Sequence, residues 1–139
     1  MGVISSMTYF IYISITQQSY FYSQSKITYF EYSQLNNLIQ EDVFESKRIN
    51  QLNENTIELV LDDFKTIKYK VNGNSLVRTF NSADEVFDVI VSSHDFTGAS
   101  YHIPKIVLTY KLFNEDIRAV YYKNFGISNS INRNYLNEY

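Results

Sequence analysis

Side chains that could carry out acid–base or metal chemistry are few in this sequence and are scattered along it. The two histidines are His94 and His102, and the acidic residues considered with them are Asp95 and Asp84. Their spacing matches neither an acid–base couple nor a metal motif such as His-Glu-x-x-His. A single histidine in a polar segment is more often a surface or capping residue than a ligand. We therefore predict no catalytic residue, no metal ligand and no cofactor site, and we expect that the protein is not an enzyme.

The composition argues against several other classes of function. The chain of 139 residues has no cysteine, which rules out disulfides, thiol catalysis and cysteine-based zinc sites. Its four glycines form no phosphate-binding loop, and its net charge of -3 argues against a nucleic-acid partner. Asp62 and Asp63 suit a tight turn, where Asp is favoured for backbone reasons. A calcium site is not predicted there, because it would need more oxygen ligands nearby. The stripe of Lys65, Lys68 and Lys70 indicates a solvated strand face.

An uncharged segment opens the chain. No charged side chain occurs before Lys26. The apolar residues of the first part of this segment include Val3, Ile4, Phe10, Ile11, Ile13 and Ile15. The run is shorter than the ~20 residues that span a bilayer. Two hypotheses stay open for it: an aromatic strand or helix packed in the core, or the back half of a membrane helix. In the second, residues 1–22 form a separate apolar segment and residues 23–139 form a globular domain.

The elements that would position any site begin with a long helix. Residues 20–48 contain neither Gly nor Pro, and apolar residues recur at spacings of three and four. The residues that this spacing places on one face, toward a sheet, are Leu35, Leu38, Ile39 and Val43. Ile27 and Phe30 extend the stripe toward the N-terminus, and Lys47 and Arg48 are expected in the last turn, where cations favour the helix dipole. One helix over residues 3–48 would be about 70 Å long, so its N-terminal part should project from a domain of this size.

Alternating patterns after the helix predict antiparallel hairpins. A turn at residues 62–64 pairs Leu59 with Ile67 and Ile57 with Tyr69 on one buried face. The Asn-Gly signal at residues 72–73 predicts a second hairpin.

The exact turn of that second hairpin stays open. A turn at Asn72-Gly73 sets Tyr69 opposite Leu76. A turn at Gly73-Asn74 shifts the pairs but keeps the same buried face, so the pattern does not choose between them.

The rest of the chain predicts one more hairpin. Residues 86–91 suggest a short buried strand and residues 92–100 a loop. A turn at Asn114-Glu115 would pair Leu112 with Ile117. Residues 125–139 are rich in Asn and are left unassigned. The predicted fold class is α+β, with the long N-terminal helix packed on an antiparallel sheet of four to six strands.

Two stretches resemble bacterial type IV pilin-like proteins, and most closely the minor pseudopilins of type II secretion and competence-type systems. Residues 67–78 (IKYKVNGNSLVR) are similar to a hairpin common in such subunits: hydrophobic, Tyr, hydrophobic, turn, then Leu, hydrophobic and Arg. Residues 35–42 (LNNLIQED) are similar to the end of the family's helix, which often carries an acidic residue there. The resemblance covers residues 3–91.

This resemblance implies a pilin-like fold and a structural role. The chain would be a minor subunit, or pseudopilin, of a type IV pilus-like filament or type II secretion pseudopilus, helping assembly or capping. Its partners would be other pilin-like subunits and, through the N-terminal helix, the inner membrane. The expected location is the bacterial inner membrane, with the globular domain in the periplasm or at the cell surface. The family's processing motif has Glu where Met7 stands, so we expect in-frame sequence upstream of Met1 to supply the leader and the Glu.

A second hypothesis does not depend on the resemblance. Aromatic residues make up 17% of the chain. In an α+β module they could line an apolar pocket that binds a ligand without catalysis.

Overall fold

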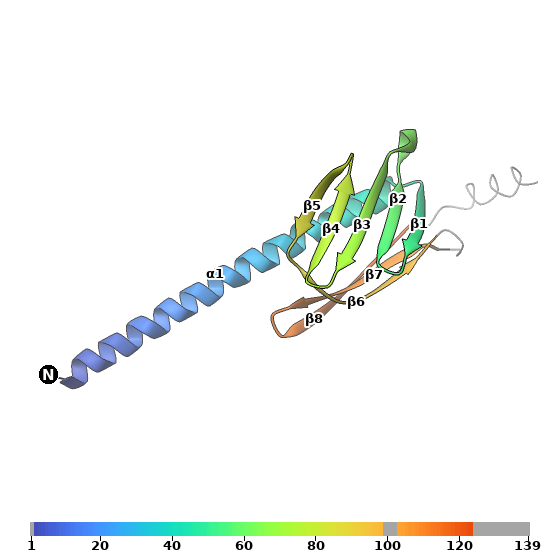
Figure 1. Ribbon diagram of the computed structural model, residues 1–139. Helices are drawn as coiled ribbons and strands as arrows, with labels where there is room; N and C mark the ends of the chain where they lie inside the picture. Colours follow the sequence, from blue (N-terminus) through green and yellow to red (C-terminus); the bar gives the residue numbers. More distant parts are fainter. Residues whose placement is uncertain (1, 99–102, 124–139) are drawn as a thin grey trace, which may run out of the picture.

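The computed structural model describes residues 2–98 and 103–123, and its elements are one long helix followed by strands (Figure 1). Helix α1 spans Gly2–Glu45, and a 3-10 turn, η1, spans Asp62–Phe64. The strands are β1 (Arg48–Asn53), β2 (Thr56–Val60), β3 (Thr66–Asn72), β4 (Ser75–Phe80), β5 (Ala83–Phe87), β6 (Ile90–Thr97), β7 (Lys105–Leu112) and β8 (Glu115–Tyr122). The predicted α+β class is therefore confirmed.

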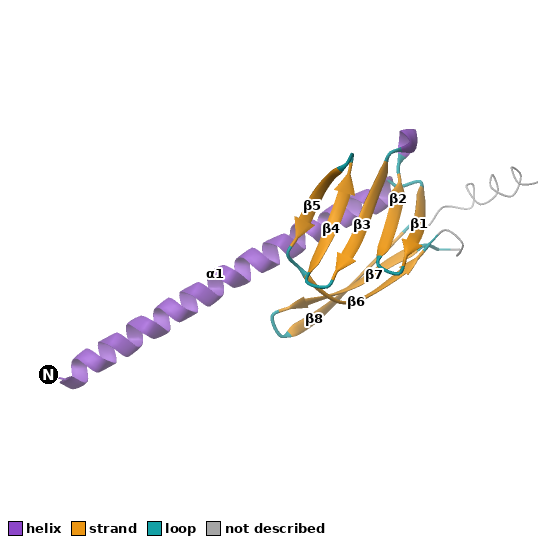
Figure 2. Ribbon diagram, in the orientation of Figure 1, coloured by secondary structure: helices purple, strands orange, loops and turns teal. Residues whose placement is uncertain are grey.

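The strands form two antiparallel sheets, where the sequence predicted one. The first has five strands in the order β1-β2-β3-β4-β5, and the second has three in the order β6-β7-β8 (Figure 2). The chain changes sheet after Phe87, where Val89 donates its backbone N–H to the Phe87 carbonyl at 2.9 Å. The strands β1 and β5 were not predicted, and β6 was predicted with the wrong bounds. The reason is the same in each case: β1, β5 and the polar middle of β6 have too few alternating apolar residues to be recognised as strands.

The C-terminal half of α1 packs against the sheets, and the N-terminal half extends beyond them (Figure 1). At 44 residues, the helix is about 66 Å long. It ends at Glu45, so the expectation that Lys47 and Arg48 lie in its last turn is wrong. The prediction that the N-terminal part projects is confirmed.

The predicted membrane helix is not supported. Within residues 2–98 and 103–123, no helix is long and apolar enough to cross a bilayer. Polar residues at 5, 6, 8 and 14 interrupt the apolar run, and Thr16-Gln17-Gln18-Ser19 ends it. The expected location in a bacterial inner membrane, with the globular domain outside the cytoplasm, is corrected accordingly.

One hydrophobic core joins the helix and both sheets. On α1, Leu35, Ile39 and Val43 are buried as predicted, whereas Leu38 is only half-buried. Ile27 and Phe30 are exposed, so the buried stripe does not extend as far toward the N-terminus as predicted. The core residues of the first sheet include Ile57, Leu59, Ile67, Tyr69 and Leu76, and those of the second include Ile106, Leu108, Tyr110 and Tyr121.

The strand registers agree with the predictions in part. The pairs Leu59–Ile67 and Ile57–Tyr69 are confirmed. The next hairpin uses the Gly73-Asn74 turn, with Gly73 at φ 53, and this register sets Tyr69 opposite Arg78. The β7–β8 register is shifted by two residues from the prediction, with Leu112 opposite Glu115 instead of Ile117.

That last shift has a local cause. Leu112 pairs with Glu115, and Phe113 occupies the first turn position at φ 57. Turn rules place glycine at such a position, so a phenylalanine there was not anticipated.

Candidate functional site

Of the residues first considered for catalysis, those that the structure describes are not assembled into an acid–base site. His94, on β6, contacts the Glu54 carbonyl at 3.0 Å and Asn55 Oδ1 at 3.1 Å through Nε2. Its ring lies 5.1 Å from that of Phe96. These partners link β6 to the β1–β2 turn and include no carboxylate. Asp95 follows His94 on the strand, so its side chain points to the opposite face.

The remaining polar candidates give no metal site either. Asp62 forms an ion pair with Lys47, and Asp84 accepts a hydrogen bond from Thr79 at 2.6 Å. Over residues 2–98 and 103–123, no group of three or more His, Cys, Asp or Glu side chains could hold a metal ion. His102 lies outside the described residues.

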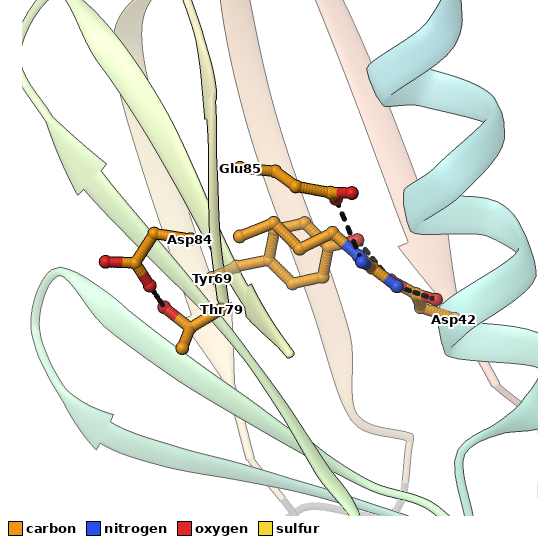
Figure 3. Close-up of polar contacts among 6 residues, drawn as sticks. Asp42, Tyr69, Thr79, Asp84 and Glu85 are labelled. Carbon is orange, nitrogen blue, oxygen red and sulfur yellow. Dashed lines mark hydrogen bonds and ion pairs between the residues drawn. The ribbon is translucent and has the colours of Figure 1, made fainter. Parts of the chain in front are cut away.

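A buried charged network instead joins the end of α1 to the first sheet. Asp42 is 5% exposed and receives two hydrogen bonds from Arg78, Nε to Oδ2 at 2.8 Å and Nη2 to Oδ1 at 3.0 Å (Figure 3). The Tyr69 hydroxyl donates to the same Oδ2. Arg78 Nη1 also donates to Glu85 Oε2 at 2.9 Å. One carboxylate on the helix thus holds side chains from β3 and β4, and through Arg78 it reaches β5.

The electrostatics of this network favour the charged pair. The hydrogen bond to Asp42 raises the pKa of Arg78 above its usual value. Burial, and then the hydrogen bond to the Asp42 carboxylate, raise the pKa of Tyr69, which stays a neutral donor. The donors satisfy the Asp42 carboxylate from several sides, so the cluster works as a fixed joint between the helix and the sheet.

The sequence patterns single out the stretches that contain these three residues, but they do not predict that their side chains contact one another. Tyr69 and Arg78 are the polar residues of the hairpin pattern at 67–78, and Asp42 is the acidic residue at the helix end. The signal that could have joined them is the Gly73-Asn74 turn, which sets Tyr69 opposite Arg78.

Two further polar contacts fix α1 to the second sheet. The Tyr121 hydroxyl donates to Asn36 Oδ1 at 2.8 Å and lies 3.3 Å from the Tyr110 hydroxyl. Lys123 donates from Nζ to the Phe44 carbonyl at 2.6 Å and also to the Ser46 carbonyl. Burial lowers the pKa of Lys123. Lys123 therefore takes the capping role at the helix C-terminus that was expected of Lys47 and Arg48.

Among the residues that the structure describes, a large exposed apolar surface lies on the N-terminal half of α1. The predicted apolar segment is placed there, and its side chains are mostly open to solvent: Ile4 73% exposed, Phe10 74%, Ile11 57% and Ile15 61%. Ile13 is half-buried, and the Val3 side chain lies outside the described residues. Further exposed aromatic residues on the helix are Tyr9, Tyr12, Tyr20, Phe21, Tyr22, Tyr29 and Phe30. The hypothesis that this segment packs in the core of its own domain is therefore wrong.

An open apolar groove lies where the helix meets the β7–β8 turn. We call it the Phe113 groove; it has a volume of about 850 Å³ and lies along residues 25–34 of α1. Ile27, Tyr29, Phe30 and Phe113 give its apolar lining, and Lys26 and Glu31 give its charged lining. The Phe113 ring packs 6.0 Å from that of Phe21, which fixes this wall of the groove against the helix.

Comparisons with known proteins identify no relative. No protein-family model, no curated protein and no solved structure matches this chain.

Proposed function

We propose that this chain is a structural, non-catalytic subunit of a filament: a minor pilin-like subunit of a type IV pilus-like fibre or type II secretion pseudopilus that helps assembly or capping. Its partners are other pilin-like subunits. The observation that carries the proposal is the N-terminal half of α1, whose large apolar side chains are mostly exposed to solvent. Exposed apolar surface of this extent marks interaction sites in other proteins.

The construction of the body supports the same role. A projecting helix can transmit force or position only if its base is rigid, and here the base is fixed to two sheets. The Asp42–Arg78–Tyr69 network holds it to β3 and β4, and Tyr121 holds it to β8. Asp42, Tyr69 and Arg78, which belong to the two stretches that resemble pseudopilins, are among the residues that fasten the helix.

The test compares two substitutions on the exposed helix. Phe10 is 74% exposed and Gln17 is also exposed, so neither Phe10→Asp nor Gln17→Asp should change the free energy of unfolding by more than about 0.5 kcal/mol. We expect Phe10→Asp to weaken self-association, measured by sedimentation velocity and electron microscopy, by at least about tenfold. Gln17→Asp should leave it nearly unchanged. Equal assembly of the two variants would refute the assignment of this surface.

The Phe113 groove favours a second candidate function, a ligand-binding module with an aromatic-lined pocket. Its volume of about 850 Å³ is in the range of small-molecule sites. This alternative expects a monomeric protein that binds one small apolar molecule, such as a fluorescent dye, and loses that binding in a Phe113→Ser variant. A filament subunit should instead lose dye binding as it assembles.

A further inference from the structure

An exposed phenylalanine lies on a constrained turn between two strands of the first sheet. Phe64, at the end of η1 between β2 and β3, is 96% exposed. Its backbone φ is 61°, in the left-handed region that bulky side chains rarely adopt. Both the exposure and the backbone conformation are unfavourable in a monomer, so they point to a contact outside it.

The turn that carries Phe64 is held in place. We call residues 62–65 the Phe64 turn. Leu61 donates its backbone N–H to the Lys65 carbonyl at 2.8 Å, and Lys65 donates its own to the Asp62 carbonyl at 3.4 Å. The ion pair between Asp62 and Lys47 ties the turn to the segment after α1. Phe64 is therefore presented on a fixed base, which lowers the entropy lost on binding.

We propose that the Phe64 turn of one copy inserts into the Phe113 groove of the next copy. This inference rests on the proposed filament role and names the contact between subunit bodies. The groove supplies Ile27, Phe30 and Phe113 as apolar walls, and its volume of about 850 Å³ admits a phenyl ring. A buried aromatic anchor in a pocket is the usual centre of a protein interface.

The charges around the two surfaces are complementary. In the turn, Asp62 precedes Phe64 and Lys65 follows it, and both side chains are exposed. In the groove, Lys26 and Glu31 lie on either side of Ile27 and Phe30 along the helix. An inserted Phe64 would bring Asp62 toward Lys26 and Lys65 toward Glu31. This arrangement selects one orientation of the turn in the groove.

The positions of the two surfaces make the contact open-ended. The Phe64 turn lies near the C-terminal end of α1, because the ion pair between Asp62 and Lys47 links the turn to the segment that follows the helix. The groove is centred near Phe30, which lies about 22 Å before Glu45 along the helix. Two different surfaces that bind each other form a heterologous interface, which continues from copy to copy and can build a fibre.

The absence of native cysteine makes a direct test possible. Full-length chains with Lys65→Cys are mixed with chains carrying Glu31→Cys, and disulfide formation between the two is followed by non-reducing electrophoresis. These changes keep Phe64 and the apolar walls. The control chain carries Asn74→Cys, on the exposed β3–β4 turn, in place of Lys65→Cys. We expect the Lys65→Cys chain to cross-link to the Glu31→Cys chain at least about tenfold faster than the control does, which is equivalent to about 1.4 kcal/mol. Adding Phe64→Ser to the Lys65→Cys chain should return the rate to that baseline.

The outcomes separate this contact from the filament role. Equal rates at the two cysteine positions, or a rate insensitive to Phe64→Ser, would overturn the proposed contact. If the unsubstituted chain still assembles in sedimentation, the filament role survives that result. Specific cross-linking, together with unsubstituted protein that sediments only as closed dimers, would support the contact and reject the filament. Monomeric wild-type protein without cross-linking would reject both.

Discussion

Asp42 shows how a single carboxylate can determine where a long helix is fixed. Its side chain is 7% exposed, and that of Arg78 is 11% exposed, so both charges are largely removed from water. A buried ion pair is tolerated only when its hydrogen bonds are satisfied, and here two bonds from Arg78 and one from Tyr69 meet that condition. The pair therefore contributes specificity of docking more than net stability.

Removing Asp42 should be costly. Asp42→Ala leaves the Arg78 guanidinium buried without its main partner, so we expect the free energy of unfolding to fall by about 3–5 kcal/mol. Denaturant unfolding followed by circular dichroism measures this. Glu85→Ala is the matched control, because Glu85 binds the same guanidinium but is 54% exposed. It should cost less than about 1 kcal/mol. Similar losses in the two variants would show that the buried pair has no special role.

The buried tyrosines predict a loss of stability at high pH. Burial raises the pKa of Tyr121 to about 12, and burial likewise raises the pKa values of Tyr69 and Tyr110 above their usual range. Unfolded tyrosines ionise near pH 10, so their stabilising effect is complete below about pH 10 and is lost as the pH rises toward about 12. Tyrosinate absorbance and circular dichroism against pH should show these residues ionising only as the fold is lost.

Neighbouring residues give the control for this prediction. Tyr121→Phe should reduce the steepness with which stability falls above pH 10, whereas Tyr122→Phe should not, because Tyr122 is 65% exposed. Ionisation of every tyrosine near pH 10 in a chain that stays folded would contradict it.

At the scale of elements, sequence patterns gave the helix and part of the pairing. The helix face was found because Leu35, Ile39 and Val43 repeat with the helical period and are buried. The β2–β3 register was found because a slip by one residue would have exposed Ile57 and Leu59. Slips by two residues keep the buried face, so periodicity could not choose the later turns. That choice depended on backbone conformation at Gly73 and Phe113.

The candidate site was less predictable than the fold. Periodicity identifies apolar faces. The contact among Asp42, Tyr69 and Arg78, however, depends on the β3–β4 register, which the alternation of apolar residues did not determine. The turn at residues 62–64 was predicted, but the exposure of Phe64 on it and the Phe113 groove were not. Phenylalanine at positive φ breaks the usual turn rules, and the groove combines residues from α1 with a turn far along the chain.

The helix face makes a prediction at this scale. Ile39 is 1% exposed, so Ile39→Ala should lower the free energy of unfolding by about 2–5 kcal/mol. Leu38 is only half-buried, and Leu38→Ala should cost less than about 1.5 kcal/mol. Denaturant unfolding of both variants measures the difference. A larger loss at Leu38 would mean that the helix is rotated relative to the sheets.

The whole molecule combines a packed body with a helical extension that lies outside its core (Figure 1). The core joins the C-terminal half of α1 to both sheets, whereas residues 4–12 are exposed throughout. The first ring contact between the helix and a strand turn is that of Phe21 with Phe113. Stability and assembly should therefore depend on different parts of the same helix.

Deleting residues 2–20 should separate these two properties. The deletion removes no core residue and retains Phe21, so we expect the thermal midpoint of unfolding to change by less than about 3 °C. Self-association in sedimentation velocity should weaken by at least about tenfold, because the exposed apolar surface of Ile4, Phe10 and Ile15 is lost. The Gln17→Asp chain at the same concentration controls for changes in charge and handling. A large fall in the midpoint would show that the extension stabilises the body, and undiminished association would move the main assembly surface to the body itself.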